Sequence, residues 1–194
     1  MVRRTTNRSM MHAGRISPCK PSDLLRRYDI DRLYHFTHVG NLPSILRSGG
    51  LLSHAKLENR SVDVRYASDT LSRNLDRAKN LDDYVRLSFV TNLPMYWKSV
   101  YRHGEGTFVW LEIDANVIDR PQTLVSTLNA TDNFALIGEA CDIVSKIPLG
   151  LLAKDIGLAD LNDHQKRVVQ AEVLVKEFVP LEMIMNFDAV TGGK

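Results

Sequence analysis

The stretch that decides how this chain is interpreted is QAEVLV at residues 170–175, in which one carboxylate, Glu172, interrupts an apolar and β-branched run. A run of this kind is typical of a buried strand. A charge on such a strand is costly to bury alone, so it must be exposed, paired or used in chemistry. Glu172 is therefore the first candidate functional residue.

A second stretch, near the start of the chain, places polar side chains on another predicted strand. It reads LYHFTH at residues 33–38. Because side chains alternate along a strand, His35 and Thr37 point to the same face. An imidazole and a hydroxyl in this arrangement are able to hold a ribose or an amide group of a small ligand, while a glutamate accepts hydrogen bonds from sugar hydroxyls.

Hydrophobic periodicity predicts the remaining elements. Asn41 is placed to cap a short helix that stops at the glycine pair 49–50. Alternation over 84–90 puts Tyr84, Arg86 and Ser88 on one face of a strand. Further helices are predicted from Ser22 or Asp23 to Tyr28 and over 69–79 and 94–102, further strands over 107–113 and 183–187, and short helices with loops over 116–170.

Length and composition indicate one domain. The chain has 194 residues, of which 44% are hydrophobic, enough for a single well-packed core. Residues 1–22 are basic and poor in apolar side chains, so we expect a flexible arm followed by a single domain over 23–194. A mitochondrial targeting segment shares the Arg and Ser bias of the arm, but the arm lacks a helical apolar stripe.

The charges are distributed unevenly. Residues 1–104 carry 18 Lys or Arg and 9 Asp or Glu, a net charge of +9, whereas residues 105–194 carry 7 and 14, a net charge of −7. A basic front half fits a polyanionic partner or cofactor phosphates, although two solvated faces of a dipolar protein would explain it equally well. Trp97, Trp110 and Tyr96 are expected in the core rather than as base-stacking platforms.

Several classes of protein are excluded or disfavoured. There is no apolar run of 18 residues for a membrane span and no signal-peptide core. Glycine-rich dinucleotide and phosphate loops, the HExxH zinc motif and the GxSxG elbow are absent. Cys19 and Cys141 lie far apart without a Cys/His cluster, so we expect free thiols, no metal site and a cytoplasmic protein.

The order and wording of three blocks resemble the DarT family of nucleic-acid ADP-ribosyltransferases. The first block is YHFTH at 34–38 with NLPSIL and GGLLS at 41–53. The second is DYV at 83–85 with PMY at 94–96, and the third is QAEVLV followed by Val179 and Pro180. The resemblance spans roughly residues 33–186. The middle block departs from the family, because RLSFVTN at 86–92 replaces an aromatic-rich strand that ends in a Pro-Arg pair.

The resemblance implies a fold and a site. The fold would be the α+β ADP-ribosyltransferase fold, with two small, mainly antiparallel sheets flanked by helices and an NAD⁺ cleft between them. Glu172 would be the catalytic glutamate. The remaining residues implied at the site are His35, Thr37, Asn41 and Tyr84 as cofactor contacts, Arg73 as the first choice for the active-site arginine, and Arg77 as the second choice and as a cofactor contact.

The resemblance also implies a reaction and its partners. NAD⁺ would be the substrate, without a metal, and ADP-ribose would pass to a nucleobase, with single-stranded DNA as the first choice of acceptor. An RNA acceptor and a non-catalytic nucleic-acid-binding domain are the alternatives. A protein that modifies bases would act as a toxin or phage-defence effector, neutralised by an antitoxin such as a macrodomain-type hydrolase.

Overall fold

The computed structural model describes residues 20–192, with the exception of 63, 66–76 and 155. Most of the predicted basic arm, and Arg73 with most of the predicted helix at 69–79, lie outside the described residues. The first described element, α1, begins at Pro21, and Ser22 is buried in it. The Ser22 hydroxyl donates a hydrogen bond to Asp119 at 2.5 Å, which joins α1 to the end of the 3₁₀ turn Ala115–Asp119.

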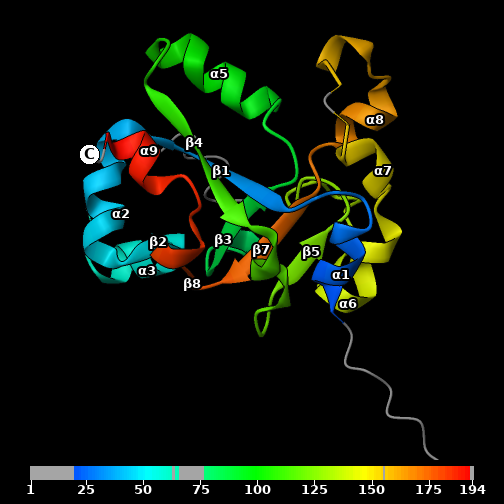
Figure 1. Ribbon diagram of the computed structural model, residues 1–194, viewed down its shortest axis with the longest axis horizontal. Coiled ribbons are helices and arrows are strands. Elements are labelled where there is room, and N and C mark those ends of the chain that lie inside the picture. The colour runs from blue at the N-terminus through cyan, green and yellow to red at the C-terminus, as the bar shows by residue number, and fades with distance from the viewer. Residues whose placement is uncertain (1–19, 63, 66–76, 155, 193–194) are drawn as a thin grey trace, which may run out of the picture.

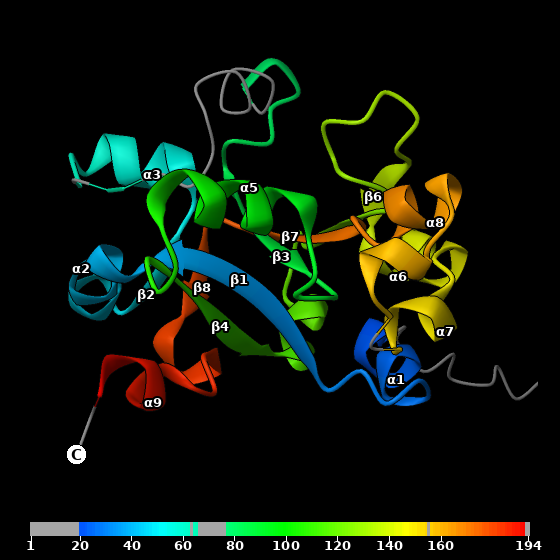
Figure 2. The ribbon, with the colours of Figure 1, turned by 90° about the horizontal axis from the view of Figure 1, so that it is seen from above.

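Two antiparallel sheets form the body of the described chain (Figures 1 and 2). The larger sheet has the strand order β4-β1-β3-β7-β5-β6, and β2 pairs with β8 in the smaller one. The sheets are therefore unequal, with six and two strands in the residues described. The strands are β1 (Arg32–His38), β2 (Gly50–Leu52), β3 (Tyr84–Ser88), β4 (Phe108–Asp114), β5 (Leu124–Ser126), β6 (Ile137–Glu139), β7 (Glu172–Lys176) and β8 (Phe178–Pro180).

Short helices surround the sheets. Helices α1, α6, α7 and α8 gather at one end of the larger sheet, whereas α2, α3 and α9 lie around the smaller sheet (Figures 1 and 2). The helices are α1 (Pro21–Arg26), α2 (Leu42–Ser48), α3 (His54–Asn59), α5 (Pro94–His103), α6 (Ala140–Ile143), α7 (Leu149–Leu152), α8 (Asp163–Val168) and α9 (Phe187–Thr191), with 3₁₀ turns at Val39–Asn41, Ala115–Asp119, Val144–Lys146, Leu158–Asp160 and Leu181–Met183. In this part of the chain no helix is long and apolar enough to cross a membrane.

The larger sheet separates a core face from a polar face. Alternate residues of its central strands are buried in the main hydrophobic cluster: Val85, Leu87, Val125, Val173 and Val175. Burial of these side chains fixes the pairing register, because a shift by one residue would move the whole set to the other face. The alternate set, which includes Arg86, Glu172 and the buried Leu174, is consequently directed to the opposite face.

Glycine brings the two sheets together. Helix α2 ends at Gly49, which has a left-handed φ of 71° as predicted from its position. The next residue, Gly50, has a φ of 149° and pairs with Pro180 of β8. A β-carbon at Gly50 would lie 2.1 Å from the carbonyl oxygen of Val179, so only glycine allows β2 to approach β8 this closely.

One residue joins the larger sheet to the smaller one. Glu177 lies between β7 and β8 and has a φ of 60°. Its N–H donates to the Asp83 carbonyl at 2.8 Å, and its carbonyl accepts from the Ser53 N–H at 2.9 Å. These bonds hold the corner at which the chain passes directly from one sheet to the other.

Two further features of the chain differ from the expectations. Residues 183–187 do not form a strand: Ile184 makes an isolated bridge to Ile113, and α9 begins at Phe187. The side chain of Asn186 instead bonds the edge of β4, since it accepts from the Glu112 N–H and donates to the Trp110 carbonyl. The predicted free thiol at Cys141 is also wrong, because this residue is disulfide-bonded.

Candidate functional site

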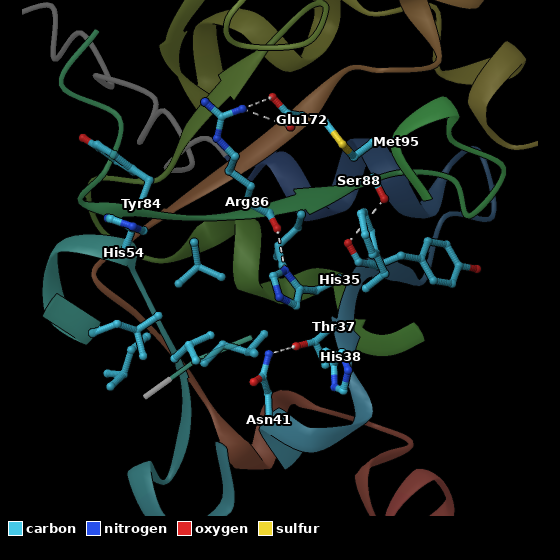
Figure 3. A pocket seen from close by; sticks show the side chains of 18 of the residues that line it. His35, Thr37, His38, Asn41, His54, Tyr84, Arg86, Ser88, Met95 and Glu172 are labelled. Atoms are coloured by element: carbon cyan, nitrogen blue, oxygen red, sulfur yellow. Dashed lines mark hydrogen bonds and ion pairs between the residues drawn. The ribbon is translucent and has the colours of Figure 1, made fainter. Parts of the chain in front are cut away.

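A cavity of about 320 Å³ lies between the two sheets, a size within the usual range for ligand pockets. Its walls come from β1, β2, β3, β7, helices α2 and α3, the first turn of α5 and the loop around residue 130. Among the sequence-predicted site residues, those that line it are His35, Thr37, Asn41, Tyr84 and Glu172. The acid near the end of the chain and the imidazole near its start therefore face one cavity (Figure 3).

Glu172 is the first residue of β7, and its carboxylate is held on two sides. Its Oε2 accepts the N–H of Ala130 at 2.7 Å, and Nη1 of Arg86 lies 3.2 Å from Oε2 and 3.4 Å from Oε1 (Figure 3). The side chain is only 14% exposed. The ion pair and the backbone N–H offset the cost of burying this charge. Glu172 is thus a paired charge, one of the three possibilities for a carboxylate on an apolar strand.

The strand register explains why Arg86 reaches Glu172. Strands β3 and β7 are antiparallel, with Ser88 directly opposite Glu172 and Arg86 opposite Leu174. Arg86 and Glu172 are therefore diagonal neighbours on one face, a separation that a long side chain can span. The alternation of Tyr84, Arg86 and Ser88 contained this signal, although Arg86 is not among the residues predicted for the site.

His35 lies where β1 and β3 separate. These two strands pair through Tyr34 and Ser88, and the next contact is a 3.0 Å hydrogen bond between Nδ1 of His35 and the carbonyl of Arg86. A carbonyl only accepts, so Nδ1 carries the proton and Nε2 of the neutral ring remains an acceptor. Desolvation lowers the pKa of His35, and the hydrogen bond to Arg86 opposes this shift. The ring is thus kept neutral, with its Nε2 lone pair available to a ligand.

Thr37 and Asn41 form a buried polar pair at the floor of the cavity. The Asn41 amide donates to Oγ1 of Thr37 at 3.1 Å and to the carbonyl of Arg65 at 2.9 Å. Its carbonyl accepts the N–H of Arg65 at 2.9 Å. Asn41 therefore does not cap α2 with its side chain, contrary to expectation, because the amide is used to attach the segment at Arg65 to the cavity wall.

Of the two predicted arginines, the structure describes only Arg77. Arg73 lies outside the described residues. Arg77 is exposed and forms an ion pair with Glu58 of α3, and it is not among the residues that line the cavity. The structure thus does not bring Arg77 to the site, because its guanidinium faces a carboxylate on the outer surface. Tyr84, in contrast, lies in the cavity wall, with Nζ of Lys176 4.8 Å from its ring centroid.

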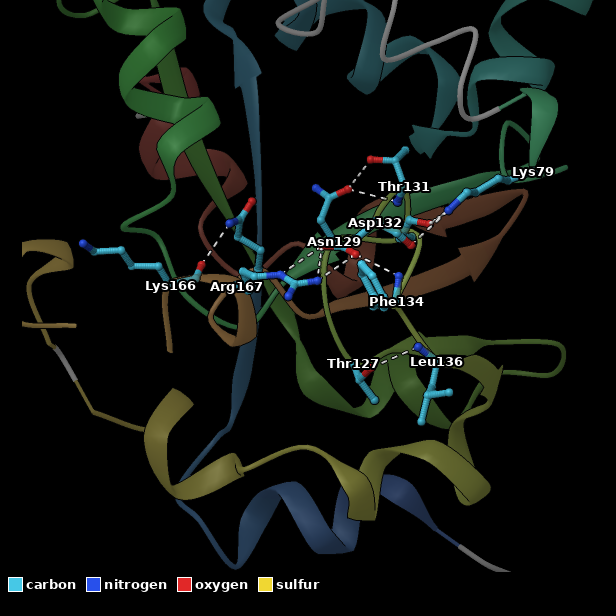
Figure 4. A network of polar contacts seen from close by, with 11 residues as sticks. Lys79, Thr127, Asn129, Thr131, Asp132, Phe134, Leu136, Lys166 and Arg167 are labelled. Atoms are coloured by element: carbon cyan, nitrogen blue, oxygen red, sulfur yellow. Dashed lines mark hydrogen bonds and ion pairs between the residues drawn. The ribbon is translucent and has the colours of Figure 1, made fainter. Parts of the chain in front are cut away.

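The loop between β5 and β6, residues 127–136, holds the carboxylate of Glu172 through the Ala130 N–H. Two cations fix this loop (Figure 4). Nζ of Lys79 donates to the carbonyls of Ala130 at 3.2 Å and Asp132 at 3.0 Å, and Arg167 of α8 pairs with both oxygens of Asp132 at 2.9 Å. The Phe134 N–H and Arg167 lower the pKa of Asp132. The loop is therefore tied to two separate parts of the chain.

The family model described as "ssDNA thymidine ADP-ribosyltransferase, DarT" matches residues 34–191 of this chain, which is most of its length. The protein belongs to the DarT family. The described residues contain no group of three or more His, Cys, Asp or Glu side chains suited to a metal ion.

Relatives of the DarT family chain are known in sequence. It is 27% identical over 154 residues to a Thermosipho africanus protein named DNA ADP-ribosyl transferase-DNA ADP-ribosyl glycohydrolase fusion protein, a match that covers 76% of this chain and 39% of that one. It is 29% identical over 98 residues to a DNA ADP-ribosyl transferase of Thermus sp., covering 45% and 47%. The chain thus spans less than half the length of these two relatives.

Solved structures share its fold. The TM-score is 0.67 to Thermosipho africanus DarTG in complex with ADP-ribose, at 24% identity over 79% of this chain and 42% of that chain. It is also 0.67 to Thermus sp. 2.9 DarT in complex with ADP-ribosylated ssDNA, at 20% identity over 80% and 79%. These likenesses confirm the predicted ADP-ribosyltransferase fold for this DarT family member.

Proposed function

We propose that this DarT-family protein transfers ADP-ribose from NAD⁺ to a nucleobase of single-stranded DNA. Thymidine is the acceptor that the family description names. The observation that carries the proposal is the single cavity that joins the held carboxylate of Glu172 to the neutral imidazole of His35. One group suits a ribose hydroxyl and the other suits an amide N–H, and both are present in the nicotinamide riboside half of NAD⁺.

Each polar group of the cavity has a part in this proposal. His35, through Nε2, and Thr37 contact the nicotinamide end, and Asn41 keeps Thr37 in place. Tyr84 provides an apolar wall for the cofactor. Glu172 accepts a hydrogen bond from the 2′-hydroxyl of the nicotinamide ribose and stabilises positive charge as the bond between C1′ and nicotinamide breaks.

Transfer to a nitrogen of the acceptor base releases a proton from the base as well as nicotinamide from NAD⁺. A nitrogen of the acceptor base forms the new bond to C1′, nicotinamide departs with the electron pair of the old bond, and the proton of the base passes to Glu172 or to water. Arg86 orients Glu172 and balances its charge before the substrate binds. Fixed groups of this kind lower the barrier because they need no reorganisation during the reaction.

The biological role proposed here is that of a toxin or phage-defence effector in the cytoplasm, restrained by an antitoxin such as a macrodomain-type hydrolase. Support comes from the Thermosipho africanus relative, whose name joins a DNA ADP-ribosyl transferase to a DNA ADP-ribosyl glycohydrolase in one chain. A transferase and an enzyme that removes its product form a natural pair for such a restraint.

Incubation with labelled NAD⁺ and separate pools of single-stranded DNA, duplex DNA, RNA and protein tests the proposal. We expect label in single-stranded DNA, and none in that pool with Glu172→Ala. Label confined to RNA would assign the protein to the alternative acceptor. Binding of nucleic acid without label in any pool would identify a non-catalytic domain and refute the proposal.

A further inference from the structure

Helix α5 presents aromatic and basic side chains to solvent. The exposed residues repeat at helical spacing on one side: Pro94, Trp97, Lys98, Tyr101 and Arg102. Trp97 is 54% exposed and Tyr101 is 94% exposed, values far above those expected of core aromatics. The helix contains no carboxylate. The expectation that Trp97 belongs to the core is therefore wrong. We call the surface formed by Trp97, Lys98, Tyr101 and Arg102 the α5 face.

Trp97 is held in a fixed orientation although it is exposed. Its Nε1 donates to Oδ1 of Asn92 at 2.8 Å, and its ring meets that of Tyr96 edge to face at a centroid distance of 5.3 Å. Tyr96 in turn packs against Phe36 and Trp110. A ring anchored in this way loses little conformational entropy when a flat partner stacks on it, which is the main benefit of preorganisation.

The α5 face is continuous with the candidate active site. Leu93, Pro94 and Met95 line the same cavity as Glu172, and Figure 3 draws Met95 and Glu172 among its lining residues. From Pro94 to Tyr101 the helix rises by about 10 Å. This length corresponds to about three stacked bases at roughly 3.4 Å each. A strand whose acceptor base enters the cavity would thus run along this face.

We propose that the α5 face, comprising Trp97, Lys98, Tyr101 and Arg102, binds the single-stranded DNA that flanks the acceptor base. The inference rests on the proposed function, which it extends from one base to a stretch of strand. Trp97 and Tyr101 stack on unpaired bases, and Lys98 and Arg102 contact phosphates. Stacked aromatic rings beside cations are the usual means of holding a single strand, and the bases of a duplex do not offer their faces to them.

The test is the affinity for a labelled, thymidine-containing oligonucleotide, measured by fluorescence anisotropy without NAD⁺. Trp97→Ala and Tyr101→Ala are each expected to weaken binding about 5- to 150-fold, the range found for loss of one stacked base. Tyr28→Ala is the matched control, because it removes an exposed aromatic in the turn that follows α1, at the far end of the sheet, and it should leave affinity unchanged. Arg102→Gln should reduce the slope of log affinity against log salt by about 0.7.

The outcomes separate this inference from the proposed function. Weaker binding by the two aromatic variants supports the α5 face even if the wild-type protein transfers no ADP-ribose, since binding is read without NAD⁺. Unchanged affinity in both variants of a protein that does modify DNA overturns the α5 face and leaves the activity in place. Tighter binding of the matching RNA, weakened by the same two aromatic variants, would also overturn it. So would variants that lose self-association of the protein while their affinity for DNA is unchanged.

Discussion

Glu172 lies on an apolar strand, and only some of the hydrogen-bond acceptor positions of its carboxylate are occupied. One N–H and one guanidinium contact it, both near Oε2, whereas an ionised carboxylate has about four acceptor positions. Acceptor capacity therefore remains for a hydroxyl of a ligand in the cavity. This is the arrangement expected of a group that binds a sugar and stabilises charge, and it requires that the charge itself be present.

Replacement of the charge tests this requirement. Glu172→Gln keeps the size of the side chain and its contact with the Ala130 N–H, but it removes the negative charge. We expect the rate of ADP-ribose transfer to fall by on the order of 10²–10³, the usual cost of losing one charge-stabilising group. Initial rates with labelled NAD⁺ measure it. Glu182→Gln, at an exposed glutamate in the turn after β8, is the control, and a rate like that of the wild type for Glu172→Gln would refute the assignment.

His35 gives the protein a pH-dependent stability. Burial disfavours the imidazolium in the folded state, so the pKa of His35 is lower in the folded than in the unfolded chain. As the pH falls below about 6.5, the unfolded chain takes up a proton that the folded protein resists. The free energy of unfolding therefore decreases as the pH falls through this range.

Urea unfolding at several pH values compares the wild type with His35→Gln, whose amide can still donate to the Arg86 carbonyl. The wild-type midpoint should decline more steeply below about pH 6.5 than that of the variant. The control His164→Gln removes an exposed imidazole and should retain the wild-type slope. Parallel curves for the wild type and His35→Gln would show that His35 does not titrate as described.

Among the elements of the site, the 127–136 loop is the part that could not be predicted from the sequence. Its residues show no periodicity, and its contact with Glu172 depends on a backbone N–H, which any residue would supply. Strand β1, helix α2, strand β3 and helix α5 were predictable, because apolar spacing and glycine stops are local signals. The strand predicted at 183–187 failed because Asn186 provides the hydrogen bonds to β4 that a strand would have made.

The cations that fix this loop should influence the reaction without touching the substrate. Lys79→Met and Arg167→Met each release one attachment of the loop, so the Ala130 N–H is held less firmly against Glu172. Loss of that charge-assisted hydrogen bond is worth about 1.5–3 kcal/mol, and we expect the double variant to lose about tenfold or more in kcat with little change in KM for NAD⁺. Steady-state kinetics measure both constants.

Lys166→Met is the matched control, because Lys166 neighbours Arg167 on α8 and its side chain lies 3.9 Å from Asp163, away from the loop. It should have the kinetics of the wild type. A double Lys79 and Arg167 variant with unchanged kcat would indicate that the loop keeps its place without these cations, and a rise in KM alone would indicate that it contacts the cofactor directly.

For the whole molecule, the approach of the two sheets depends on the absence of a side chain at position 50. Gly50→Ala would place a β-carbon against the Val179 carbonyl, so β2 must move from β8. We expect the free energy of unfolding to fall by about 1–3 kcal/mol from overpacking. Gly150→Ala is the control: an added β-carbon there meets Tyr28 at 3.6 Å, an ordinary contact, and alanine favours the helix. Equal stability of the two variants, measured by denaturant unfolding, would contradict this account.

From the sequence, Glu172 and His35 could be predicted to share one site, and both line the same cavity. The contact between Arg86 and Glu172 could not be predicted in this way. The family resemblance implied Arg73, which lies outside the described residues, and Arg77, which forms an ion pair with Glu58. Arg86 instead reaches Glu172 by a diagonal across two strands, which depends on the pairing register of segments 86 residues apart in the chain. Only the family resemblance connected these distant segments before the structure did. Tertiary pairing of this kind has no local signal.

The single-residue corner at Glu177 makes the width of the cleft and the position of the carboxylate depend on each other. The strand that begins with Glu172 continues, six residues later at Phe178, into the sheet that forms the opposite wall. A ligand that pushes the walls apart would pull on the same short piece of backbone that carries Glu172. The separation of the cleft walls and the position of the Glu172 carboxylate are thereby linked through one continuous stretch of backbone.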